Sequence, residues 1–102
     1  MTMSSRRLTI RDIKVAVARS CNVSVKDMES RCRNAEFVFA RHLTAYLARH
    51  LTGKSLQTIG DMLGGLEHGS LRHGIKKIEA QISDGDVVLL ERLFALRKDL
   101  AA

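Results

Sequence analysis

Apolar residues recur at helical spacing near the amino terminus of this chain. Ile10, Ile13 and Val17 follow one another at the spacing that places side chains on one face of a helix. Thr9 stands just before this run, and Asp12 follows Thr9 by three positions, a weak form of the capping box that begins many helices. The pattern therefore predicts a first helix that begins after Thr9.

A second, shorter helix is predicted over residues 25–28. Ser24 precedes it and Asp27 lies three positions later, so the same capping pattern returns. Residues 30–35 then show no apolar periodicity and contain two arginines, which indicates a basic loop.

The longest helix is predicted from about Glu36 onward. Gly53 favours the left-handed backbone that ends many helices, so it marks the carboxyl end. The apolar stripe of this helix consists of Phe37, Ala40, Leu43, Leu47 and Leu51.

Two further helices, over residues 55–63 and 68–82, are separated by a glycine pair. Ser55 caps the first of them, and Gly64 and Gly65 allow the left-handed backbone of a sharp turn. This arrangement is typical of a helix-turn-helix, in which the second helix exposes small or hydrogen-bonding residues at its amino end to the major groove of DNA. The polar residues at that end are His68, Gly69, Ser70, Arg72 and His73. The alternative is an ordinary helical hairpin with solvated charge.

A last helix is predicted over residues 87–100, after a turn at residues 83–86. Three or four apolar positions per two turns suffice to bury one helix face. Either this helix is simply buried against the helix that follows Thr9, or part of its face contacts a partner. Its apolar arc is wider than burial needs and consists of Val87, Leu89, Leu90, Leu93, Phe94, Leu96 and Leu100.

These elements predict an all-α fold of about six helices, in one domain over residues 8–101 that follows a flexible basic amino terminus over residues 1–7. The chain has 102 residues, enough for one core, and 45% apolar but only 4% aromatic residues, with no proline. This composition favours an aliphatic helical core. No apolar run is long enough to cross a membrane, no secretory signal stands at the start, and two cysteines do not form a disulfide framework. A cytoplasmic setting is therefore expected.

The charge is unevenly distributed. Seventeen Lys and Arg against eleven Asp and Glu give a net charge of +6. Residues 1–82 carry 14 basic and 7 acidic groups, and residues 83–102 carry 3 and 4. The basic part of the chain, residues 1–82, favours a polyanionic partner, and nucleic acid rather than a membrane. The alternative is that the positive charge only keeps the chain soluble. The four histidines and two cysteines lack zinc spacing, and no catalytic set is evident, so no metal, cofactor or enzymatic activity is expected.

The residues between positions 55 and 79 resemble a known family. They are similar to the carboxy-terminal DNA-binding domain of the bacterial replication initiator DnaA, which has a Trp-repressor-like helix-turn-helix. The resemblance extends without gaps back to Thr9 and more loosely to about Leu100, so it covers nearly the whole chain. The positions that match the family signature are Ile59, Gly60, Gly64, Gly65, His68, His73, Lys77 and Ile78.

The resemblance implies roles for the residues that stand at the places of the family's DNA contacts. Arg33 would enter the minor groove of DNA, where arginine suits the negative potential. Base edges in the major groove would be read by Glu67, His68 and Gly69, and glutamate can accept a hydrogen bond from cytosine. Phosphates would be met by basic and hydroxyl side chains. These phosphate contacts are Arg31, Arg41, Arg49, Ser55, Ser70, Arg72 and Lys77.

The chain also departs from the family pattern. Leu66 stands where the family has arginine, Glu67 replaces its aspartate, and Gly69 and Ser70 replace its two threonines. These changes predict a different preferred DNA sequence and weaker nonspecific affinity. Ala35 and Phe39 replace arginines, and Ala40 replaces the usual proline.

The expected function is that of a freestanding, sequence-specific, double-stranded DNA-binding protein associated with the nucleoid. The chain lacks the family's ATPase, so it is expected to act as a transcription regulator that recruits or positions polymerase, a sigma-like factor or the initiator through residues 87–100. A replication regulator that competes for origin sites is the near alternative. A protein-protein interaction module that kept the fold is the alternative from another class.

Overall fold

The computed structural model describes residues 8–101, and all regular elements in that range are helices. The predicted all-α fold with six helices is therefore confirmed. The expected flexible amino terminus, residues 1–7, lies outside the described residues. None of the helices in the described range is long and apolar enough to cross a membrane. The helices are α1 Ile10–Cys21, α2 Val25–Glu29, α3 Ala35–Thr52, α4 Leu56–Met62, α5 His68–Ser83 and α6 Val87–Ala101.

Side-chain caps explain where the first four helices begin. The hydroxyl of Thr9 accepts a hydrogen bond from the backbone N–H of Asp12, whose carboxylate accepts one from the N–H of Thr9, so the predicted capping box is present. The long helix α3 begins one residue earlier than expected, because the Asn34 side chain accepts from the N–H of Glu36 and caps it. At its other end, Gly53 adopts the predicted left-handed backbone with φ of 67°.

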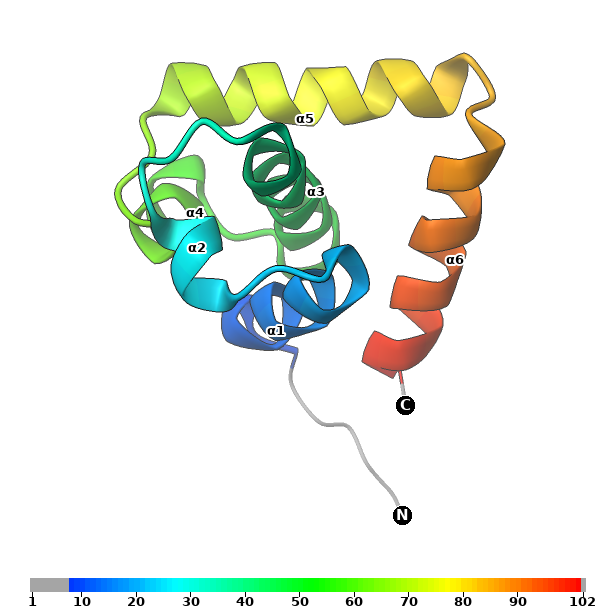
Figure 1. Cartoon of the computed structure of the whole chain (residues 1–102), viewed down its shortest axis with the longest axis horizontal. Helices are drawn as coiled ribbons and strands as arrows, with labels where there is room; N and C mark the ends of the chain where they lie inside the picture. Colours follow the sequence, from blue (N-terminus) through cyan, green and yellow to red (C-terminus); the bar gives the residue numbers. More distant parts are fainter. Residues whose placement is uncertain (1–7, 102) are drawn as a thin grey trace.

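The helix α3 runs through the middle of the molecule and packs against α1, α2, α4 and α5 (Figure 1). Leu43 and Leu47, from the predicted stripe, are fully buried. Phe37 and Leu51, at the two ends of the stripe, are half-buried because few elements cover the ends of α3. The fully buried side chains are mostly aliphatic, as the composition predicts, and include Ile13, Val17, Ile59, Leu63, Leu71, Ile78 and Leu96.

A buried lysine joins three of the helices. Lys14 of α1 is 6% exposed and forms an ion pair with Glu29 at the end of α2. Its Nζ also donates a hydrogen bond of 2.7 Å to the carbonyl oxygen of Met62 at the end of α4. A buried ammonium group is tolerated only when its hydrogen bonds are satisfied, so this contact ties the end of α4 to α1 and α2.

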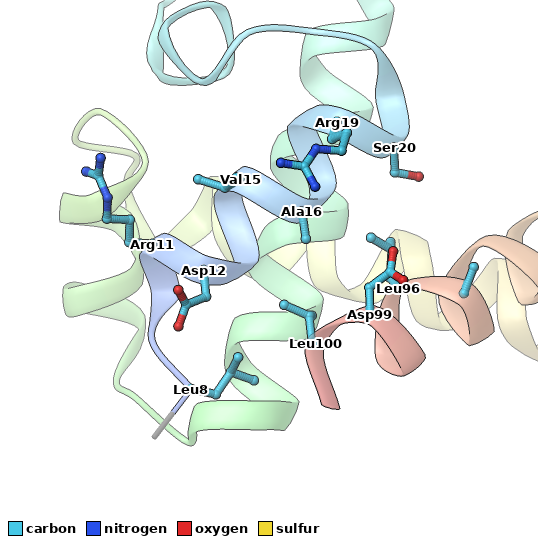
Figure 2. A pocket seen from close by; sticks show the side chains of 11 residues that line it. Leu8, Arg11, Asp12, Val15, Ala16, Arg19, Ser20, Leu96, Asp99 and Leu100 are labelled. Carbon is cyan, nitrogen blue, oxygen red and sulfur yellow. The ribbon is translucent and has the colours of Figure 1, made fainter. Parts of the chain in front are cut away.

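The helix α6 lies at the opposite end of the molecule from α2 and α4 (Figure 1). One stripe, Leu89, Leu93 and Leu96, is buried, and the helix packs mainly against α1. A pocket of about 510 Å³ lies beside this contact. Figure 2 shows its lining side chains, with Leu96 and Leu100 of α6 near α1. Burial accounts for only part of the predicted apolar arc: Leu100 is half-buried, but Val87, Leu90 and Phe94 are exposed. Val88, outside the predicted arc, is exposed as well.

Candidate nucleic-acid interface

The turn between α4 and α5 is compact because one carbonyl oxygen accepts hydrogen bonds from three backbone N–H groups. The oxygen of Gly60 accepts hydrogen bonds of 2.9–3.0 Å from the N–H groups of Leu63, Gly65 and Leu66. Gly64 has a φ of 81°, and a Cβ at this position would lie 2.1 Å from the backbone oxygen of Glu29. Only glycine satisfies both the left-handed backbone and this close approach to α2. The turn that leads into α5 is therefore held against the end of α2.

The amino end of α5 is exposed. Glu67 occupies the N-cap position, and its carboxylate makes no cap hydrogen bond within the described structure, so the helix itself does not use it. His68, Gly69 and Ser70 follow as exposed residues, and nothing lies within 4 Å of the place of a Cβ at Gly69. This end of α5 thus presents free polar groups, a small residue and the positive end of the helix dipole to the outside.

The basic loop between α2 and α3 is held by Arg41. This residue of α3 is 7% exposed, and its Nε donates 2.6 Å to the carbonyl oxygen of Met28. Its Nη2 donates 2.6 Å to the oxygen of Ser30 and 2.7 Å to that of Cys32. The planar guanidinium suits this task, because its several donors point at several acceptors at once.

This placement differs from the phosphate contact expected of Arg41. The side chain points to the loop carbonyls, because residue 41 faces α2 and the loop rather than solvent. Its contacts are with the backbone of α2 and the loop, whereas Arg31 and Arg33 on that loop are exposed.

A hollow of about 790 Å³ lies between this loop and the start of α5. Four cationic side chains are among the described residues that line it, against one carboxylate, that of Glu67. Such a balance favours a polyanion. The sequence-predicted site residues that the structure brings together here are Arg31, Arg33, Arg41, Glu67, Gly69, Ser70 and Lys77.

Four other predicted site residues do not line the hollow. His68 and Arg72 are exposed on α5 beside it. Ser55 caps α4, where its hydroxyl accepts a 3.2 Å hydrogen bond from the N–H of Thr58. Arg49 donates 2.8 Å from Nη1 to the carbonyl oxygen of Lys54 and so supports the segment between α3 and α4.

His42 also lines the hollow, although sequence reasoning did not assign it a role at the site. Its ring and that of His73 meet edge to face with centroids 6.0 Å apart. Partial burial lowers the pKa of His42, and the nearby charges of Lys77, His73 and Arg41 lower it further. A glycine inside α5, Gly74, was the available signal, because a mid-helix glycine often marks a close approach.

No group of three or more His, Cys, Asp or Glu residues in the range 8–101 is arranged to hold a metal ion. The arrangement that the hollow does offer is a cationic recess between an arginine-bearing loop and an exposed helix start.

Comparisons with known proteins identify the family of this helix-turn-helix. The profile of the family described as bacterial dnaA protein helix-turn-helix matches residues 10–78. The chromosomal replication initiator protein DnaA of Nitrobacter hamburgensis is 41% identical over 95 residues, which are 93% of this chain and 20% of that protein. The DnaA proteins of Rhodopseudomonas palustris strain BisB5 and Bradyrhizobium sp. strain ORS 278 are each 40% identical over the same lengths and shares. The chain thus spans about one fifth of these relatives, and it belongs to the bacterial DnaA helix-turn-helix family.

Proposed function

We propose that this chain binds double-stranded DNA in a sequence-specific way, with the start of α5 in the major groove and the loop before α3 at the adjacent minor groove. The observation that carries the proposal is the cationic hollow that Arg33 and Glu67 both line. A helix-turn-helix reads bases with the amino end of its second helix, and this end is exposed here.

The bases are contacted by the residues at the start of α5 and by one arginine of the loop before α3. Glu67 has a carboxylate that the helix cap leaves available, so it can accept a hydrogen bond from a cytosine amino group. His68 can donate to or accept from a base edge, and Gly69 lets the backbone approach the bases closely. Arg33 is exposed on the loop and suits a narrow minor groove.

Phosphate contacts fall to the cations and hydroxyls around this centre. Ser70 and Lys77 line the hollow from α5, Arg72 flanks it, and Arg31 faces it from the loop. Such contacts fix the register on the duplex without reading its sequence. Arg49 and Ser55 lie beyond the hollow, so they would reach phosphates of the flanking backbone only. Arg41 acts as a positioning residue for the loop.

Two cellular roles are compatible with this site. One is a transcription regulator that recruits or positions other factors on chromosomal DNA. The other is a replication regulator that competes for initiator sites, and the match to chromosomal replication initiator proteins favours it. Mapping of bound sites across the genome separates these roles, because origin-proximal sites support the second and promoter sites the first.

Salt titration of DNA binding tests the proposal itself. Each phosphate contact releases counterions, so the logarithm of affinity for random duplex should fall steeply with the logarithm of salt concentration. Selection from a random duplex library should then yield a motif. A chain that binds no duplex even at low salt would instead be a protein-interaction module that kept the fold.

A further inference from the structure

The imidazole of His42 lines the hollow without a hydrogen-bond partner on the protein. The helix α5 crosses α3 here (Figure 1), and the ring of His42 meets that of His73 edge to face with centroids 6.0 Å apart. Neither ring nitrogen of His42 is hydrogen-bonded within residues 8–101. A protonated imidazole has two N–H donors, and in the free chain both would find only water as an acceptor.

The charged groups that surround His42 in the hollow are almost all positive. Partial burial is the first cause that lowers the pKa of His42, and neighbouring positive charges lower it further. Residues 63–66 of the turn between α4 and α5 also line the hollow and are uncharged. The free chain therefore binds a proton at His42 less readily than an ordinary histidine does. The groups are Arg41 of α3, His73 and Lys77 of α5, and Arg31 and Arg33 of the loop, against the carboxylate of Glu67.

A duplex seated over the hollow would reverse the sign of the charge that His42 faces. DNA carries about one negative charge per 1.7 Å of its axis, and its phosphate oxygens accept hydrogen bonds. An opposite charge within about 4–6 Å changes a pKa by about 1–3, and for a histidine the change is upward. Docking also removes water from the ring, which acts in the opposite direction, but a phosphate both pairs with the added charge and accepts its N–H. We propose that His42 takes up a proton when DNA fills the hollow, so that the affinity of this chain for duplex rises as the pH falls.

Proton uptake and DNA binding then strengthen each other. The affinity rises as the pH falls through the pKa that His42 has in the complex, and the gain is complete below its pKa in the free chain. One proton gives at most about a tenfold gain in affinity per pH unit. The inference rests on the proposed DNA site and adds a dependence on pH to it.

Fluorescence anisotropy with the selected motif, at constant ionic strength, measures the effect in the full chain. Between about pH 8 and about pH 6, where histidine is the side chain that ordinarily titrates, the affinity should rise about threefold to tenfold. His42→Gln should lose most of this rise, because an amide does not titrate. Circular dichroism at each pH establishes that the parent chain and the variant keep their helices.

Two other histidines provide the controls. His50→Gln is the matched variant, because His50 lies on the same helix, is absent from the described lining of the hollow and has its Nε2 3.7 Å from Oε2 of Glu79. This variant should keep the whole rise. His68→Gln removes a proposed base contact, so it should weaken binding at every pH but keep the larger part of the rise. A rise that persists in His42→Gln and disappears in His68→Gln would overturn the proposal.

Nuclear magnetic resonance of the histidine rings gives a readout that does not depend on the stability of any variant. The Cε1–H signal of His42, assigned by its loss in His42→Gln, should titrate at a higher pH in the complex with DNA than in the free chain. An equal or lower pKa of His42 in the complex would overturn the proposal.

The same titrations separate this proposal from the proposed function. A chain that binds the motif with equal affinity at both ends of the pH range would overturn the proton uptake and leave the DNA site intact. A chain that binds no duplex at low salt, at either end of the range, would overturn both.

Discussion

The imidazole ring of His42 fills the space that a side chain at Gly74 would need. A Cβ at Gly74 would lie 2.4 Å from Cδ2 of His42 and 2.8 Å from its Cγ. The helices α3 and α5 are therefore in close contact at this pair. His42, whose pKa is lowered, also lines the hollow. His42 thus contributes both to the packing of α3 on α5 and to the wall of the proposed DNA site.

Gly74→Ala should destabilise the fold, although alanine is the better helix former. The propensity gain is about 1 kcal/mol, whereas overpacking costs about 1–3 kcal/mol, so we expect a net loss of about 1 kcal/mol in urea unfolding. Gly69→Ala is the control on the same helix, because the space around it is open and the change should not destabilise the chain. Equal stability of the two variants would contradict the close contact.

His42 should make the stability of the free chain depend on pH. Because the folded state lowers its pKa below the ordinary 6.5, the unfolded chain binds a proton first as the pH falls. The contribution is fully present above pH 6.5 and is lost as the pH falls through the folded pKa. Urea unfolding between neutral and mildly acidic pH measures this loss. His42→Gln should remove that part of the slope, and an unchanged slope in this variant would assign the titration to other groups.

Arg33→Ala should weaken specific DNA binding by about 1–3 kcal/mol, as expected for a good base contact. The side chain is exposed, so the free energy of unfolding should stay the same. Fluorescence anisotropy with the selected motif and with random duplex measures both affinities. Undiminished affinity for the motif would remove Arg33 from the site.

Arg41→Ala should lower both stability and DNA affinity, in contrast to Arg33→Ala. The change leaves the carbonyl oxygens of Met28, Ser30 and Cys32 without their donor, and we expect a loss of about 2 kcal/mol in unfolding. The loop that carries Arg33 would then lose its shape. A variant that unfolds like the parent chain but binds DNA less well would show that Arg41 contacts DNA directly.

Lys77→Ala should weaken binding to all duplex sequences by about the same factor. It should also reduce the salt slope by about 1, because one phosphate contact is lost. The measurement is the same anisotropy titration over several salt concentrations. If the preferred motif changed instead, Lys77 would be reading bases.

Local signals were sufficient to predict most of the fold. Thr9 with Asp12, Ser24 and Ser55 act as caps where the sequence places them, and the φ of Gly53 is left-handed as expected. These features depend on neighbours only a few residues away, so sequence spacing suffices to find them.

Features that depend on distant neighbours were harder to predict. Arg41 looks like any surface arginine in the sequence, and only the return of the loop over α3 surrounds it with carbonyl groups. The role of His42 likewise requires α5 to pass beside it. On α6, spacing predicted the apolar arc, but the packing against α1 decides which half is covered.

Because Lys14 anchors α4, the helix pair α4 and α5 cannot be taken out of this domain without losing a contact. The ammonium that holds the carbonyl of Met62 belongs to α1, about fifty positions earlier in the chain, and Glu29 of α2 neutralises it. A synthetic peptide of residues 55–82, or a graft of that segment onto another scaffold, would lack the hydrogen bond from Lys14 at this end of α4. Any transplant that is meant to keep the native crossing of α4 and α5 must therefore include α1 and α2 as well.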